Sequence, residues 1–392
     1  MGLLSFQTSR SGLLTLLGDV LSVQTGVDYN ARLRLRLIDK NVSWQALLEF
    51  AQEQGVLWAL IWSLQRRSLL LPMPASDDAN LRHPSLQLVS AYREHLARRQ
   101  RQRDQLLVLI GGLNRAKLKP LLLKGARLLV AQPDPWVEAR DMRDIDLLVR
   151  PQDAESAAAT LGTMGYAVDD SGAPVDQHLP EMWQIGQPSV VEIHTNALSF
   201  SARKLLPTDE IWQRAIPMLA EGCYFFVMPV EWHLLHAILS HQISDRGHIR
   251  RILAAKPIWE FTMSVSEVTA EGWLAIAKRM VECGQSDVLG SWIVQAQKLY
   301  GLSPPSSVAI SPTARAHAAA TLANAVLPGW LRQASCIVDE FRFAFARETL
   351  AARYRIDVED VSLATRVRHL KFLRRYYRGR LTSRLFGARS PP

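Results

Sequence analysis

Two aspartates one residue apart, Asp144 and Asp146, have the types and spacing that most directly suggest chemistry. They begin an apolar run that continues to Val149, and side chains alternate between the two faces of a strand. Both carboxylates are therefore expected on one face. Such a pair repels itself, and a hard divalent cation such as Mg²⁺ relieves the repulsion by taking oxygen ligands from both. An Asp-x-Asp pair alone is weak evidence, because most such pairs are surface charges.

A candidate phosphate-binding segment lies upstream at Lys124 and Gly125. It follows the apolar run 121–123 and precedes an expected helix over 126–131, where backbone N–H groups, a helix N-terminus and a cation can receive phosphates. Arg140, four residues before Asp144, could add a forked donor. The plainer interpretations are that Gly125 is a turn glycine and Arg140 a solvated charge.

The elements that must position these residues alternate in type. Strands are expected over 121–123, 145–149, 166–168 and 190–194, with helices over 126–131 and 153–165. This order describes a compact α/β unit from about 118 to 200. In its last strand Glu192 and His194 share one face, and His178 is a further residue that could line the cleft.

Helical patterns flank this unit on both sides. Ser43 can cap a helix, and a long helix is expected from near Pro84 to about Lys117. Beyond residue 228 the pattern is helical to the end. We therefore expect a helical N-terminal region over 1–117, an α/β core over 118–228, and a helical C-terminal region over 229–392 with a basic tail.

The chain has 392 residues, of which 48% are hydrophobic and 21% charged, and this composition excludes a chain that stays unfolded. Its net charge of +9 is concentrated in the tail, because the segment from Arg366 to Arg389 holds nine Lys or Arg residues and no acid. This segment also carries aromatic residues. Such a tail is typical of contact with RNA or an anionic surface, and a solvated basic helix is the alternative.

The three cysteines, Cys223, Cys283 and Cys336, are far apart and form no C-x-x-C pair. They are expected to be reduced thiols of a cytoplasmic protein. The apolar run near the N-terminus is interrupted by Asp19, so no signal peptide is expected, and no segment has the apolar length that spans a bilayer.

Three segments carry a resemblance to a known family: LLLKGARLL over 121–129, RDMRDIDLLV over 140–149, and Asp153 with Gly165–Tyr166. They resemble the nucleotidyltransferase-like proteins of the DNA polymerase beta superfamily. More narrowly, they are similar to a bacterial family of uncharacterised nucleotidyltransferases. The resemblance is specific over about 118–200 and looser outside it. It implies an α+β fold, with a small nucleotidyltransferase-type mixed sheet and flanking helices, embedded between mostly helical N- and C-terminal regions.

The resemblance also implies a metal-dependent nucleotidyltransferase that uses an NTP and Mg²⁺ or Mn²⁺. In that scheme Asp144 and Asp146 bind metal, and a third carboxylate on a later strand completes the catalytic set. Glu192 is the choice, because its strand is the only carboxylate-bearing one at a suitable distance. The nucleotide would lie against the remaining candidates, Lys124, Gly125, Arg140 and His194.

Two departures from the family pattern leave alternatives open. First, Lys124-Gly125 replaces the glycine-serine turn of the wider superfamily. Second, in the helical segment after residue 231 relatives often carry an acid after an arginine, whereas this chain has the stretch from Arg250 to Lys256, which contains no acid. The acceptor is not identified. A non-catalytic scaffold that keeps the fold, and an RNA-modifying toxin-type nucleotidyltransferase, are the two alternatives.

Overall fold

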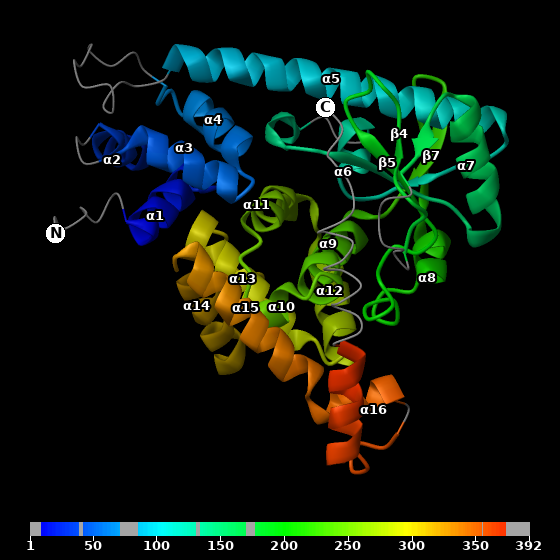
Figure 1. Ribbon diagram of the computed structural model, residues 1–392. Helices are drawn as coiled ribbons and strands as arrows, with labels where there is room; N and C mark the ends of the chain where they lie inside the picture. Colours follow the sequence, from blue (N-terminus) through cyan, green and yellow to red (C-terminus); the bar gives the residue numbers. More distant parts are fainter. Residues whose placement is uncertain are drawn as a thin grey trace.

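The computed structural model describes residues 9–38, 42–70, 85–130, 134–169, 177–354 and 356–373. Within them, a seven-stranded mixed sheet is surrounded by helices, so the expected α+β fold is confirmed (Figure 1). The basic tail beyond residue 373 lies outside the described residues.

The described residues of the N-terminal region form four short helices and one long one: α1 (Arg10–Leu21), α2 (Val27–Leu37), α3 (Trp44–Glu53), α4 (Leu57–Arg66) and α5 (Ser85–Arg115). The hydroxyl of Ser9 caps α1 and that of Ser43 caps α3, each accepting a hydrogen bond from a first-turn backbone N–H. In Figure 1, α5 runs past both the short N-terminal helices and the sheet. It thereby connects the two parts of the molecule.

The sheet combines parallel and antiparallel pairs. Its strands are β1 (Leu121–Leu122), β2 (Asp144–Leu148), β3 (Ala167–Val168), β4 (Met182–Trp183), β5 (Val190–His194), β6 (Ile216–Ala220) and β7 (Cys223–Val227), in the order β3-β4-β5-β2-β1-β7-β6. The central pair, β2 and β5, is parallel, and Asp146 lies opposite Glu192. Helices α6 (Lys124–Val130) and α7 (Ala154–Thr163) connect these strands, and α8 (Thr208–Arg214) precedes β6.

Three strands were not predicted. β4 has only two residues, and β6 is a largely exposed edge strand that contains Pro217. β6 and β7 form a hairpin whose turn residues, Glu221 and Gly222, both have positive φ, at 49° and 75°. That backbone matches the twist of two antiparallel strands.

The two faces of the sheet have different neighbours. Ile145 and Leu147 of β2, like Val191 and Ile193 of β5, pack into an apolar core with α5 and α7. Period-2 alternation places Asp144, Asp146, Glu192 and His194 on the opposite face.

That opposite face meets the larger apolar core of the molecule. This core joins Leu121 and Leu148 of the sheet to residues of α1, α3, α4 and the helices after residue 228. The core thus draws on all three expected regions. The division at residues 117 and 228 stays a prediction.

The described residues of the C-terminal region are mostly helical. Their helices include α9 (Val230–Leu239), α10 (Gly247–Arg250), α11 (Ala255–Ser264), α12 (Ala270–Glu282), α13 (Ser286–Tyr300), α14 (Pro312–Ala325), α15 (Gly329–Ala344) and α16 (Arg347–Tyr354), and residues 363–373 are also helical. None of the helices in the described part of the chain is both long and apolar enough to cross a membrane. The three cysteines are free thiols.

Buried polar side chains of α5 hold the backbone just before β2 and β5. Gln102 donates from Nε2 to the Met142 carbonyl at 3.0 Å and to the Ser189 hydroxyl at 2.7 Å. Gln105 donates from Nε2 to the Ser189 carbonyl at 2.8 Å and accepts from the Ser189 N–H at 3.2 Å. The polar face of α5 is therefore an internal contact that aligns the two central strands.

We expect Gln105→Ala to lower the free energy of unfolding by about 2–4 kcal/mol, because it leaves the buried N–H and C=O of Ser189 without their partner. Urea unfolding followed by circular dichroism measures this change. Gln100→Ala removes an exposed glutamine of the same helix and should change stability by less than about 0.5 kcal/mol. Equal effects of the two substitutions would contradict the alignment role.

Candidate active site

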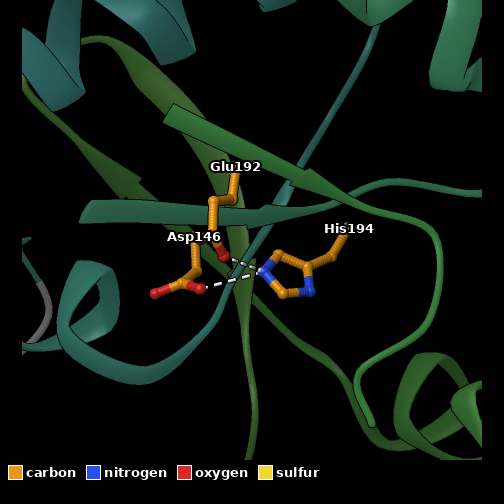
Figure 2. Close-up of side chains that lie close together, drawn as sticks. All are labelled: Asp146, Glu192 and His194. Atoms are coloured by element: carbon orange, nitrogen blue, oxygen red, sulfur yellow. Dashed lines mark hydrogen bonds and ion pairs between the residues drawn. The ribbon is translucent and has the colours of Figure 1, made fainter. Parts of the chain in front are cut away.

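Three side chains from the two central strands converge at one point. The Nε2 atom of His194 lies 2.9 Å from Asp146 Oδ1 and 3.0 Å from Glu192 Oε2 (Figure 2). One ligand atom from each of the three residues lies within 4.8 Å of the other two. The register explains this convergence, because Asp146 pairs with Glu192, and His194 follows two residues later on the same face.

Lys124, the first residue of α6, completes the surroundings of Asp146. Its ammonium Nζ lies 2.6 Å from Asp146 Oδ1, the same oxygen that faces His194. The backbone of Lys124 has a φ of 42°, a left-handed conformation that is uncommon for a residue with a side chain. This conformation ends β1 and starts α6, so that the side chain points back toward β2.

Burial and charge act against each other at this cluster. Burial favours the neutral form of Asp146, which is 1% exposed, but the Lys124 ammonium and the His194 ring outweigh burial and hold the pKa of the carboxyl well below its usual range. Burial likewise opposes the charged forms of Lys124 and His194. Their contacts with the carboxylates prevail and raise the pKa of both groups.

Asp144 lies on the same face of β2 but outside the three-residue cluster. Burial, followed by repulsion from the Asp146 carboxylate, raises its pKa. The two aspartates therefore differ in character, although they stand at equivalent positions of one pattern. Asp146 is the buried, charge-compensated member, and Asp144 is the half-buried one at the start of the strand.

Gly125 and Arg140 contact each other directly. A Cβ atom at Gly125 would lie 1.9 Å from Arg140 Nη1, so only glycine leaves room for the guanidinium in this position. Arg140 Nε also lies 2.9 Å from Glu260 Oε1, and the Arg140 carbonyl accepts a hydrogen bond from Arg99 of α5. Arg140 is therefore held by protein contacts beside the turn that carries Lys124.

The sequence did not identify α11 as part of this site. Its residues Lys256 and Glu260, one helical turn apart, both reach the segment before β2: Glu260 pairs with Arg140, and Lys256 donates from Nζ to the Asp141 carbonyl at 2.5 Å. Burial, followed by the neighbouring Arg140 guanidinium, lowers the pKa of Lys256. The only signal in the sequence was helical spacing, which does not say what a helix packs against.

His178, a minor candidate from the sequence, lies at the edge of the cluster. It forms an isolated β-bridge with His194, and the two ring centres are 5.1 Å apart. Its Nε2 lies 3.9 Å from Glu192 Oε2. His178 therefore flanks the carboxylate without belonging to the converging set.

The donor set fits a divalent cation. Carboxylate oxygens and imidazole nitrogen are ordinary ligands of divalent metals, and here one oxygen of Asp146, one of Glu192 and the His194 nitrogen face a common point. Fixed strands hold all three, so the arrangement needs little reorganisation to receive an ion.

Comparison with known proteins identifies the family of this chain. Residues 40–301 of the 392 match a family described as uncharacterised nucleotidyltransferase. No curated protein and no solved structure matches the chain. The matched range contains the whole sheet, the Lys124 turn and the α11 residues that contact it. The chain therefore belongs to the family of uncharacterised nucleotidyltransferases.

Proposed function

We propose that this protein transfers a nucleoside monophosphate from an NTP to an acceptor hydroxyl or phosphate, with a divalent cation as cofactor. The observation that carries the proposal is the convergence of Asp146, Glu192 and His194 on the face of the sheet that also receives Lys124. Family membership supports the reaction class. A place in the DNA polymerase beta superfamily, a bacterial origin and a cytoplasmic location belong to the same proposal.

In the proposed reaction an acceptor oxygen forms a bond to the α-phosphorus of the NTP. The bond from that phosphorus to the bridging oxygen breaks, and pyrophosphate leaves with the electron pair while the acceptor proton passes to solvent. Asp146 and Glu192 would hold the cation with His194, and Asp144 would extend the acidic face toward a second ion. A divalent cation bound there supplies charge neutralisation for the triphosphate and the developing oxyanion.

Lys124 is proposed as a phosphate ligand. Its ammonium is tied to Asp146 and its side chain is 30% exposed, so it can exchange a carboxylate partner for a phosphate one when a nucleotide enters. Gly125 and Arg140 line the same turn. Arg140 can add its guanidinium to the phosphate contacts while Glu260 keeps it in place.

The arrangement favours the enzyme over a scaffold that merely keeps the fold. A buried charge costs stability unless it is fully paired. A protein that used this fold only as a scaffold would therefore gain nothing from burying Asp146 beside Glu192. The acceptor stays open within the class of hydroxyls and phosphates, and it includes the RNA ends used by toxin-type relatives.

Asp146→Asn should abolish transfer, because it removes a metal-binding charge while nearly preserving shape. The measurement is transfer of label from an NTP labelled at the α-phosphate to components of a cell extract, with Mg²⁺ or Mn²⁺ present. An NTP labelled at the γ-phosphate should transfer nothing, since that label leaves with pyrophosphate.

Asp209→Asn provides the control, because it removes an exposed carboxylate of α8 that does not belong to the converging set. This variant should retain full transfer. Retained transfer by folded Asp146→Asn protein would rule out the metal-centre assignment.

Lys124→Met should weaken NTP binding by about tenfold or more, in line with the loss of a charge-assisted hydrogen bond. Metal binding in the absence of nucleotide should not weaken, because the substitution removes a cation that competes for Asp146 Oδ1. Calorimetric titration measures both affinities. Lys278→Met, an exposed lysine of α12, should change neither. An equal loss of both affinities in Lys124→Met would contradict the phosphate role.

The basic tail is a separate part of the proposal, as a contact for RNA or an anionic surface. Its described beginning is helical over 363–373 and presents Arg366, Arg368 and Lys371, of which Arg368 stacks over the Tyr354 ring. Truncation there would also remove His369, which is buried against the same ring, so substitutions are the cleaner test.

Arg366→Gln with Lys371→Gln should lower the salt dependence of RNA binding by roughly 0.7–0.9 in log–log slope for each phosphate that the variant no longer neutralises. Binding is measured by fluorescence anisotropy over a salt series. Arg93→Gln with Arg101→Gln removes the same charge from exposed positions of α5 and should leave the slope unchanged. If full-length protein binds neither RNA nor anionic vesicles at about 50 mM salt, the proposal that the basic tail contacts a polyanion is wrong.

A further inference from the structure

We propose that the cation of this site is a transition ion of the Mn²⁺ type in preference to Mg²⁺, with His194 as the ligand that sets the preference. The inference rests on the proposed function, because it concerns the metal centre of the same site. It goes further by ordering the ions and by attributing that order to His194.

The position of His194 leaves its ring few other roles. The residue is 0% exposed, and its Nε2 atom faces only the two carboxylate oxygens of Asp146 and Glu192. A buried ring whose reactive nitrogen is enclosed by metal-binding carboxylates cannot reach an acceptor hydroxyl to act as a base. It can share an ion with those carboxylates.

A neighbouring histidine shows what a purely structural arrangement looks like in this protein. His236 of α9 is also fully buried, but its Nε2 hydrogen-bonds the Ala197 carbonyl at 2.9 Å. That is a satisfied contact with the main chain and needs no ion. His194 differs because two side-chain anions meet at its nitrogen, and a cation placed among them would replace repulsion between those anions with attraction to both.

The ligand chemistry then orders the ions. Mg²⁺ takes oxygen ligands, demands near-ideal octahedral geometry and gives up water reluctantly, so an imidazole in its coordination shell is unfavourable. Mn²⁺ accepts the same carboxylates, waters and phosphates, and as a first-row transition ion it tolerates one imidazole nitrogen better than Mg²⁺ does. A site of three oxygen ligands would not separate the two ions in this way. Here one of the three donor atoms is a nitrogen, and this nitrogen favours Mn²⁺ over Mg²⁺.

The test compares Mn²⁺ and Mg²⁺ affinities of the full-length protein by calorimetric titration without nucleotide. We expect wild-type protein to bind Mn²⁺ at least about tenfold more tightly than Mg²⁺. His194→Gln, which offers an amide oxygen in place of the ring nitrogen, should reduce that ratio by about tenfold through loss of Mn²⁺ affinity. His178→Gln is the matched control, because it changes a histidine beside Glu192 but outside the cluster, and it should leave the ratio unchanged.

A spectroscopic measurement keeps the inference testable if His194→Gln fails to fold. Electron spin-echo modulation of Mn²⁺ bound to wild-type protein should show coupling to an imidazole nitrogen. Absence of that coupling, or equal ratios in wild-type and His194→Gln protein, would overturn the assignment while leaving the metal centre in place. Failure to bind either ion at millimolar concentration would remove the metal centre itself, and with it the proposed function.

Discussion

The buried carboxylate of Asp146 sets the strictest requirement in this structure. A charge that is 1% exposed is tolerated only when neighbouring cations or hydrogen-bond donors compensate it. Lys124 and His194 do so at 2.6 Å and 2.9 Å from the same oxygen. The two partners come from different elements, so β1, β2 and β5 must be held in one arrangement for the carboxylate to stay charged.

Elements far away in sequence secure that arrangement. Gln102 and Gln105 of α5 hold the backbone that leads into β2 and β5, and α11 holds the segment around Arg140 and Asp141 from the opposite side. These contacts from α5 and α11 hold main-chain groups or a residue just before a strand. The strands can therefore carry polar side chains on one face without losing their register, because the other face is packed with apolar residues.

The same arrangement gives two similar carboxylates, Asp146 and Asp144, opposite pKa shifts. Asp146 has a pKa below its usual range because the Lys124 ammonium and the His194 ring contact its carboxylate, whereas burial and the neighbouring charge raise the pKa of Asp144. One position is thus a fixed anion. The other is Asp144, and a cation bound beside it would lower the pKa of its carboxyl.

The local features of this protein could be predicted from its sequence alone. Period-2 alternation predicted that Asp144 and Asp146 share a face and that Glu192 shares one with His194, and it located β2 and β5 closely. Lys124 and Gly125 were expected to precede the helix after β1, but they are its first two residues, because α6 begins at Lys124. Strands β4, β6 and β7 were missed: β4 has only two residues and β6 is largely exposed, so neither leaves a clear periodic signal, and β7 is paired with β6 through a tight turn.

Which side chains meet became clear only from the folded arrangement. The parallel pairing of β2 with β5 brings Glu192 and His194, instead of Asp144, into one cluster with Asp146. The contact of α11 with Arg140 joins residues about 120 positions apart. The physical reason is that alternation and helical spacing are properties of consecutive residues. Strand register and helix docking depend instead on burial across the whole core, which a local pattern does not encode.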